Sequence, residues 1–314
     1  MKDLLTPIDR DLIKAELTED KLLRTTNKAG NLIYLTTASE SPNIMKEIAR
    51  IRELAFRLCG AGSGKLFDMD EFDWAERPYK QLFVWDPQNE EIIGGYRLVF
   101  GNEVDLKEDG QPDLVTAGMY KFSQKFIDEY LPCTIELGRS FVHPDYQASK
   151  MGAKSLYSLD NLWDGLGAIT VLRPEMKYFF GKVTVYPNYD ETARELIFTF
   201  LNKFFADTES LVEPIEPFKR PILSEEMATL FKGECFKEEY KILNGKVRDR
   251  GVNIPPLVNT YMGLSSKTKS FGYAVCEELG GLIEFAIMVP IYEMYEEKKA
   301  RHIETYINEN NFKL

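Results

Sequence analysis

The spacing of hydrophobic and polar positions predicts a series of strands along the chain. Apolar runs bounded by turn-forming residues fall at 31–37, 81–85, 92–100, 134–142, 178–186, 271–277 and 282–291. The stretch Asp86-Pro-Gln-Asn-Glu90 between the second and third runs is typical of a turn. We therefore expect these two runs to pair as a hairpin, and the last two runs to form a closing hairpin.

Apolar residues at helical spacing predict three well-defined helices. The first follows Ser41-Pro42, which places a capping residue before a proline at the first helical position, and it ends at Gly60. The second covers Met151 to Leu166, and the third begins at Asp190 and runs to Phe205. Weaker patterns predict a helical lead-in over 1–25, a short helix over 119–130 and a peripheral helical insert over 207–256.

The order of these elements indicates the fold class. Strands in hairpins come first, a strand–helix–strand passage follows, and a hairpin closes the chain. This order predicts an α/β (α+β) protein with a mixed, mostly antiparallel sheet flanked by helices. No internal repeat or linker is visible in the sequence, so we expect a single domain over 1–314.

Composition and charge narrow the classes of protein. Among the 314 residues 44% are hydrophobic and 28% are charged, which is typical of a globular protein. The acidic N-terminal residues argue against a signal peptide, and the apolar runs are too short to span a bilayer, so we expect a cytoplasmic protein. A net charge of −11 argues against nucleic acid as the main partner. The four cysteines form no CxxC pair and are expected to be reduced and buried.

Asp68, Asp70 and Asp73 place three carboxylates within six residues. A calcium loop of the EF-hand type needs glycine at its sixth position and glutamate at its twelfth, where this chain has Asp73 and Tyr79. The sequence has only two histidines, which also disfavours a histidine-rich zinc site, and we expect no bound metal. Three interpretations stay open: a solvated acidic turn, an amine-binding site and pairing with arginines.

Charged residues interrupt two of the apolar strands. Glu136 and Arg139 lie in the run 134–142, where burial is costly unless the charges are paired. Their positions have opposite parity, so an ideal strand points them to opposite faces, and Gly138 is a candidate bulge that redirects one of them. Arg97 lies in the run 92–100 and is either a partner for the aspartates or an edge arginine that reaches solvent. A purely structural ion pair is an equally good interpretation of Glu136 and Arg139.

The segment before the second helix carries Lys150, Gly152 and Lys154. Backbone N–H groups at a helix start, flanked by lysines, are able to bind a phosphate. No Walker or G-x-G-x-x-G pattern is present, so a plain helix start is the better explanation of this segment taken alone.

Taken in order, these motifs resemble those of acyl-homoserine-lactone synthases, which have the GNAT fold. The series is Arg52-x-x-x-Phe56, then Asp68-x-Asp70-x-x-Asp73, then Gly95-x-Arg97-Leu, then Glu136-x-x-Arg139. The string Glu-Leu-Gly-Arg-Ser-Phe-Val-His-Pro over 136–144 looks closer still to the ornithine-lipid N-acyltransferases, often labelled hemolysin-like, whose relatives make glycine lipids. Leu162-Trp-Asp-Gly-Leu166 and Ile254-Pro-Pro-Leu257 add to that likeness.

The resemblance implies a sheet splayed at its centre, with the acyl chain and pantetheine between 134–142 and 178–186. It implies direct attack of the acceptor amine on a thioester, with Glu136 as the candidate base and an ionic network of Asp70, Asp73, Arg97 and Arg139 around it. Residues implied in substrate binding are Arg52, Phe56, Asp68, Ser140, His143, Lys150, Gly152 and Lys154. No cofactor is expected to stay bound. Residues 147–153 match the phosphate-binding loop of the family poorly, which favours an acyl carrier protein over acyl-CoA as the donor.

The function that follows is transfer of a (3-hydroxy) fatty-acyl group from acyl carrier protein to a small amino acid, glycine or ornithine, in amino-acid-lipid synthesis. A lactone synthase is one alternative, but the tryptophan those enzymes carry is replaced here by the glycine-rich stretch 59–64. A non-catalytic GNAT module that binds acyl carriers is the other. Two basic groups are candidates for docking the carrier: Lys150, Lys154, Arg173 and Lys177, or the run 241–250. The insert over 207–256 is the candidate for peripheral membrane contact.

Overall fold

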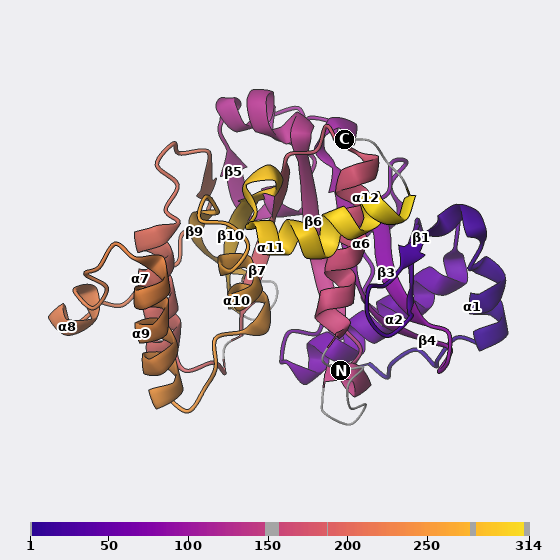
Figure 1. Ribbon diagram of the computed structural model, residues 1–314, viewed down its shortest axis with the longest axis horizontal. Helices are drawn as coiled ribbons and strands as arrows, with labels where there is room; N and C mark the ends of the chain where they lie inside the picture. The colour runs from indigo at the N-terminus through magenta and orange to yellow at the C-terminus, as the bar shows by residue number, and fades with distance from the viewer. Residues whose placement is uncertain (1, 148–156, 187, 277–280, 311–314) are drawn as a thin grey trace. The chain divides into compact units, whose positions relative to one another are not determined.

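The computed structural model describes residues 2–147, 157–186, 188–276 and 281–310 (Figure 1). The chain divides into two compact units, and each unit combines segments that are distant in the sequence. Unit 1 consists of Met1–Val104, Pro132–Lys177 and Tyr295–Leu314. Unit 2 consists of Asp105–Leu131 and Tyr178–Met294.

Unit 1 is built on an antiparallel sheet in the order β1-β2-β3-β4-β6. The strands are β1 (Leu22–Thr25), β2 (Leu32–Thr36), β3 (Lys80–Asp86), β4 (Glu91–Phe100) and β6 (Thr134–Val142). The predicted hairpin is confirmed, since β3 and β4 pair from Lys80↔Leu98 to Asp86↔Glu91. The predicted strand 134–142 coincides with β6.

Helices α2 (Pro42–Leu58) and α6 (Ser158–Leu172) cover opposite faces of this sheet. Phe83 belongs to the buried cluster that includes Ile48 and Ile51 of α2, whereas a methyl group added at Gly165 of α6 would lie 3.0 Å from the Leu82 side chain. Because Leu82 and Phe83 are neighbours on β3, their side chains point to opposite faces. The buried cluster between α2 and the sheet is the core that supports the candidate site.

The N-terminal cap of α2 differs from the predicted one. Pro42 does occupy the start of the helix, but the Ser41 side chain makes no capping hydrogen bond. The Glu16 carboxylate accepts instead from the backbone N–H groups of Asn43 (3.0 Å) and Ile44 (2.9 Å). A residue 27 positions away therefore satisfies the free donors of the helix start.

The predicted helical lead-in over 1–25 is wrong for its second half. Only α1 (Arg10–Glu16) and the 3₁₀ turn η1 (Glu19–Lys21) are helical, and β1 follows as the strand beside β2. Four residues are too few for sequence periodicity to identify a strand, and pairing with β2 decides the conformation.

The chain also continues beyond the predicted closing hairpin and returns to unit 1. The helical segments are α11 (Glu296–Lys299), η9 (Ala300–Glu304) and α12 (Thr305–Asn310). Of these, η9 and α12 contact α6, as Figure 1 shows for α12. His302 on η9 binds Asp164 of α6, with 2.8 Å between Nδ1 and Oδ1. Asp164 belongs to the Leu162–Leu166 motif, so part of that motif anchors the C-terminal segment. Other short helical segments of unit 1 are α3 (Glu71–Trp74), η2 (Gly101–Glu103) and α4 (Pro144–Gln147), and η5 (Leu131–Cys133) lies at the boundary between the two units in the sequence.

Unit 2 contains the antiparallel strands β7 (Tyr178–Val185), β10 (Leu282–Pro290) and β9 (Lys269–Cys276), which confirms the closing hairpin. A second pair joins β5 (Tyr120–Phe122) to β8 (Val212–Pro214). The predicted helix from 190 is confirmed as α7 (Glu191–Phe204), and Asp190 caps it by accepting from the N–H of Ala193. The remaining helical segments are η3 (Val115–Gly118), η4 (Phe126–Tyr130), α8 (Glu225–Ala228), α9 (Phe236–Asp249), α10 (Pro256–Met262) and η8 (Ile291–Glu293).

Three further expectations need correction. The predicted helix over 119–130 begins as strand β5, because Tyr120 and Phe122 alternate with exposed Lys121 and pair with β8. The insert over 207–256 contains a strand, β8, as well as helices. The expectation that the cysteines are buried is also wrong: Cys235, at the start of α9, is exposed, and the other three cysteines are only half-buried.

Within the described residues, no helix combines the length and apolar character needed to cross a bilayer.

Candidate active site

The acidic segment 68–73 forms the start of the short helix α3. Asp70 is the N-cap residue, and its Oδ1 accepts from the N–H of Phe72 at 3.2 Å. Asp73 returns the interaction, because its Oδ2 accepts from the N–H of Asp70 at 3.2 Å. This reciprocal capping fixes the backbone and aims the remaining carboxylate oxygens towards the sheet.

Three arginines from three elements pair with these carboxylates. Arg52 of α2 donates from Nε to Asp68 (2.9 Å), and its Nη2 lies 3.3 Å from Asp73 Oδ2. Arg97 of β4 donates from Nη1 to Asp70 Oδ1 (2.6 Å) and lies 3.3 Å from the same oxygen of Asp73. Of the three interpretations of the acidic segment, the structure therefore favours pairing with arginines.

A bulge between β4 and β6 supplies the third arginine. Gly95 pairs with Phe141 and Arg97 pairs with Gly138, so that Arg139 and Ser140 face only one residue of β4. Arg139 adopts a left-handed conformation with φ of 48°, which is uncommon for a residue with a side chain. The predicted bulge is present, but the left-handed residue is Arg139 itself.

The bulge changes the direction of the Arg139 side chain. The register places Glu136 opposite Val99 and Gly138 opposite Arg97, so Glu136 and Arg97 share one face of the sheet. Strict alternation would send Arg139 to the other face. Instead, its Nη2 lies 3.2 Å from Asp70 Oδ2 and 3.4 Å from Asp68 Oδ1, on the face of Arg97.

Burial and charge together set the protonation of this network. Burial raises the pKa of Asp70, but the Arg97 and Arg139 guanidinium groups outweigh it and hold that pKa at about 2. Burial also raises the pKa of Asp68, and the charges of Arg52, Arg139 and Arg97 bring it below its ordinary value. Although burial opposes the charged form of Arg97, Asp73 and Asp70 raise its pKa further. These shifts keep Asp68, Asp70 and Arg97 ionised near neutral pH.

Glu136 lies on the same sheet face as the network and is 3% exposed. Its Oε2 accepts a hydrogen bond from the hydroxyl of Tyr79, a short contact between two buried side chains. The Arg97 guanidinium lies over the Tyr79 ring, 5.2 Å from its centroid. Glu136 is thus held beside the ionic network through Tyr79.

The other predicted substrate-binding residues occupy different surroundings. Phe56 of α2 is half-buried and packs against the core between α2 and the sheet. Ser140 lies in the bulge. His143 follows β6, and its Nδ1 accepts from the N–H of Asp145 at 3.2 Å; burial lowers its pKa. Lys150, Gly152 and Lys154 lie outside the described residues.

Sequence reasoning missed two residues of the site. Gln81 of β3 pairs with Arg97 in the sheet register and donates from Nε2 to Asp73 Oδ1 at 3.0 Å. Tyr79 precedes β3 and binds Glu136. The sequence did contain a signal for Gln81, because it is a polar residue inside an otherwise apolar strand. No local signal distinguishes Tyr79 from a tyrosine of the hydrophobic core.

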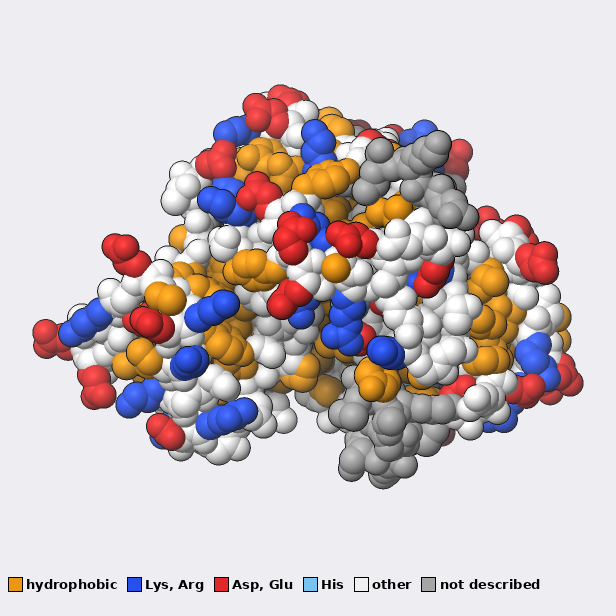
Figure 2. All heavy atoms as spheres, viewed as in Figure 1, with side chains coloured by type: hydrophobic (Ala, Val, Ile, Leu, Met, Phe, Trp, Pro, Cys, Tyr) orange, Lys and Arg blue, Asp and Glu red, His pale blue; other side chains and the backbone are white. Residues whose placement is uncertain are grey.

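The candidate carrier-docking residues are not equally available. Arg173 donates to Glu103 at 3.0 Å and to Glu175 at 2.5 Å, which ties its charge to unit 1. In the run 241–250, Lys241, Lys246 and Arg248 are exposed on α9. Figure 2 shows basic side chains over this part of unit 2, with acidic side chains among them. The α9 surface is therefore of mixed charge.

Fold and site together define the class of protein. Residues 51–156, which carry the second half of α2, the acidic segment, β3, β4 and β6, match the model of the acetyltransferase (GNAT) domain. The protein is an acyltransferase with a GNAT domain, and the site lies within the matched segment.

The comparison with curated relatives is more specific. A glycine N(alpha)-acyltransferase of Phocaeicola vulgatus is 51% identical over 99% of this chain and 95% of its own length. Another glycine N(alpha)-acyltransferase, from Bacteroides thetaiotaomicron, is 52% identical over 98% of this chain and 91% of its own length. The chain belongs to the family of these N-acyltransferases.

Solved structures show a more distant likeness. A CoA-dependent acyl-homoserine lactone synthase, solved with MTA, is 10% identical and covers 91% of this chain and 92% of its own, with a TM-score of 0.34. The same kind of enzyme solved with SAM and isopentyl-CoA is 11% identical, with a TM-score of 0.33.

Proposed function

We propose that this protein transfers a fatty-acyl group from the thioester of an acyl carrier protein to the amino group of glycine. The observation that carries the proposal is the buried Glu136, held by Tyr79 on the sheet face of the arginine–aspartate network. The near-full-length identity to two glycine N(alpha)-acyltransferases supports glycine, rather than ornithine, as the acceptor.

The chemistry requires removal of a proton from the acceptor. Glycine carries its amine as an ammonium group near neutral pH, which is not a nucleophile. Glu136 accepts one proton, directly or through a water molecule, and the free amine attacks the thioester carbonyl. The C–N bond forms, the C–S bond breaks, and the thiol of the carrier leaves with a proton.

The tetrahedral intermediate of this reaction carries an oxyanion. A bulge frees backbone N–H groups from the regular ladder, and the bulge at Arg139 and Ser140 lies on the strand of Glu136. We assign one of these N–H groups to the oxyanion. The ionic network holds α3 and the bulge in fixed positions, so that the donor is already oriented when charge develops.

The choice of an acyl carrier protein as donor rests on the sequence. The segment 147–153 lacks the glycine-rich pattern that binds the pyrophosphate of coenzyme A, whereas the carrier offers a single phosphate. A long-chain N-acylglycine is a lipid, which makes amino-acid-lipid synthesis the corresponding biosynthetic role.

An endpoint assay tests the proposal. Purified protein is incubated with 3-hydroxyacyl carrier protein and a mixture of all amino acids including ornithine, and N-acyl products are identified by mass spectrometry. We expect N-acylglycine as the dominant product, and a parallel reaction with acyl-CoA to be slower. Dominant N-acylornithine would refute the acceptor. Intact carrier thioester with no product from either donor would leave a non-catalytic acyl-binding module as the better description.

A further inference from the structure

The ion pairs of the candidate site form a closed ring. Each of the three arginines contacts two aspartates, and each aspartate contacts two arginines, at distances between 2.6 and 3.4 Å. In order around the ring, the members are Arg52, Asp68, Arg139, Asp70, Arg97 and Asp73. Because three positive and three negative charges alternate, the ring has no net charge.

The ring is exposed at one edge. The side chains of Arg139 and Asp70, which are neighbours in the ring, are 28% and 20% exposed. Each of the other four side chains is at most 5% exposed. A molecule that reaches the ring from solvent therefore meets one guanidinium group and one carboxylate, 3.2 Å apart.

Both groups of this edge keep hydrogen-bonding capacity. Arg139 contacts Asp68 and Asp70 through Nη2, whereas its Nε is buried and has no hydrogen-bond partner within the described part of the chain. Asp70 Oδ2 accepts from Arg139, and a carboxylate oxygen is able to accept a second hydrogen bond. A buried donor without a partner is costly, so a bound molecule that accepts from Nε would be favoured.

The backbone of Arg139 directs this edge towards the candidate base. Its left-handed conformation is strained, and strained residues are characteristic of functional sites. The conformation brings the guanidinium group to the sheet face that Arg97 shares with Glu136. The exposed edge and the base therefore lie on one face of the sheet.

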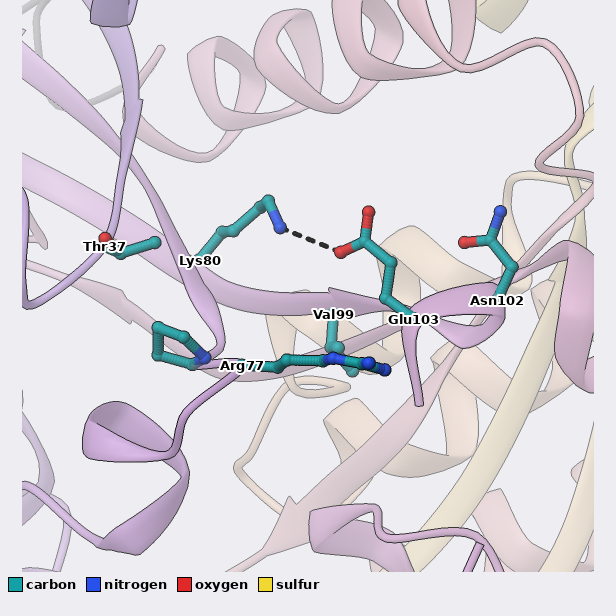
Figure 3. A pocket seen from close by; sticks show the side chains of 7 residues that line it. Thr37, Arg77, Lys80, Val99, Asn102 and Glu103 are labelled. Carbon is teal, nitrogen blue, oxygen red and sulfur yellow. Dashed lines mark hydrogen bonds and ion pairs between the residues drawn. The ribbon is translucent and has the colours of Figure 1, made fainter. Parts of the chain in front are cut away.

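A pocket of about 360 Å³ in unit 1 is less suitable for the acceptor (Figure 3). Lys80 of its lining is paired with Glu103 at 2.9 Å, and Arg173 lies 3.0 Å from the other oxygen of that carboxylate. Lys80 and Gln81 are neighbours on β3, so their side chains point to opposite sheet faces. Because Gln81 binds Asp73 of the ring, Lys80 points away from the ring.

We propose that the acceptor amino acid binds the exposed edge of the ring as a zwitterion, with its carboxylate on Arg139 and its ammonium group on Asp70. The inference rests on the proposed function and assigns the acceptor subsite of the same reaction. Arg97 and Arg139 hold the pKa of Asp70 at about 2, so this carboxylate stays ionised and pairs with the ammonium group. Removal of the proton remains the role of Glu136.

The first test uses the unmodified enzyme. Glycinamide has the amine of glycine but lacks the carboxylate. It also loses its ammonium proton more readily, so a preference for glycine reports the carboxylate and not the reactivity of the amine. With saturating acyl donor, we expect kcat/KM for glycine to exceed that for glycinamide by about 10- to 100-fold, the worth of a charge-assisted hydrogen bond. Equal use of the two acceptors would overturn the inference.

Two variants separate the two contacts. Arg139→Gln should reduce the preference for glycine over glycinamide to within about 3-fold, because glycinamide does not use the guanidinium group. Asp70→Asn should lower kcat/KM for both acceptors by a similar factor, because both carry an ammonium group. A purely structural role of Arg139 would lower both rates alike and leave the preference as it is in the unmodified enzyme.

Further variants serve as controls. Arg50 of α2 is also paired with a carboxylate, that of Glu47 at 2.6 Å, but lies outside the ring, so Arg50→Gln should leave the preference unchanged. Arg139→Lys keeps the charge but not the guanidinium fork, and should reduce the preference by a smaller factor than Arg139→Gln. Thermal unfolding checks that each variant is folded, and Arg139→Lys provides the test if Arg139→Gln is not.

The outcomes separate the inference from the proposed function. Absence of N-acylglycine formation by the unmodified enzyme would count against the proposed function itself. N-acylglycine formation with an undiminished preference for glycine in folded Arg139 variants would refute the subsite alone. Loss of the preference in Arg139→Gln, together with an equal loss of rate for both acceptors in Asp70→Asn, is the result that supports it.

Discussion

Arg97 of β4 and Asp70 at the N-cap of α3 form an ion pair of 2.6 Å, 27 residues apart in sequence. Arg97 is 1% exposed, so its charge has no access to bulk water and depends on this carboxylate and on Asp73. The pair fastens the acidic helix start to the centre of the sheet. The network thereby links the position of α3 to that of β4, which pairs with β6, the strand that carries Glu136.

Replacement of Asp70 tests the electrostatics of this link through pH. The folded pKa of Asp70 is about 2, below the ordinary value of 3.8, because Arg97 and Arg139 outweigh the effect of burial. A lowered folded pKa gives stability that is present above pH 3.8 and is lost as pH falls towards 2. Asp70→Asn should therefore reduce the free energy of unfolding at pH 6, and should reduce its slope between pH 4 and 2 by up to about 1.4 kcal/mol per pH unit.

Urea unfolding of the wild-type protein and of Asp70→Asn at several pH values measures both quantities. Glu71→Gln, a neighbouring exposed carboxylate on the same helix, is the matched control and should leave the slope near that of the wild type. Parallel pH profiles for wild type and Asp70→Asn would show that Asp70 does not carry this linkage.

Glu136→Gln tests the assignment of the base. The substitution keeps the size of the side chain and a hydrogen-bonding partner for Tyr79, but removes the ability to accept a proton at neutral pH. We expect kcat for N-acylglycine formation to fall by about 10²- to 10⁴-fold with little change in KM for the donor. Tyr79→Phe should cost less, about 10-fold, because the carboxylate remains. Full turnover by a folded Glu136→Gln protein would remove Glu136 from the mechanism.

The left-handed conformation of Arg139 can be separated from its charge. Arg139→Ala and Arg139→Gly both lose the contacts with Asp68 and Asp70, but only glycine accepts φ of 48° without strain. We expect Arg139→Gly to be more stable than Arg139→Ala by about 1 kcal/mol, with activity low in both. Thermal unfolding and the N-acylation assay measure the two effects. Equal stability of the two variants would contradict a strained backbone at the bulge.

Gly167 should tolerate no side chain, because the C-terminal segment lies directly against it. A Cβ atom at this position would lie 2.1 Å from the carbonyl oxygen of His302. Gly167→Ala should therefore displace η9 from α6 and lower the free energy of unfolding by about 1–3 kcal/mol. A Cβ atom added at Gly245 in α9 would have no other atom within 4 Å, so Gly245→Ala should instead raise the free energy of unfolding by about 0.5–1 kcal/mol. Denaturation with urea compares the two, and a loss of stability in both variants would refute the explanation by contact.

Several elements were predictable because their signals are local. The strands β3, β4 and β6 have long apolar runs, and α7 has both a cap and a continuous apolar face. Shorter or edge elements were not predictable, since β1 and β5 take their conformation from pairing with a partner strand. The cap of α2 by Glu16 is likewise a contact between distant residues.

The sequence by itself determined the family pattern: the order of Arg52, the three aspartates, Arg97 and Glu136, and with it the class of chemistry. It also showed that an arginine and a glutamate buried in one strand need partners, because an unpaired charge is costly away from water. The resemblance already implied an ionic network of Asp70, Asp73, Arg97 and Arg139. The tertiary structure adds Tyr79 as the partner of Glu136 and Asp68 as a second partner of Arg139. Side-chain direction at Arg139 depends on a single extra residue in β6, which reverses the face that parity predicts. The hydrogen bond between Tyr79 and Glu136 likewise joins residues 57 positions apart, and no local pattern of residues encodes it.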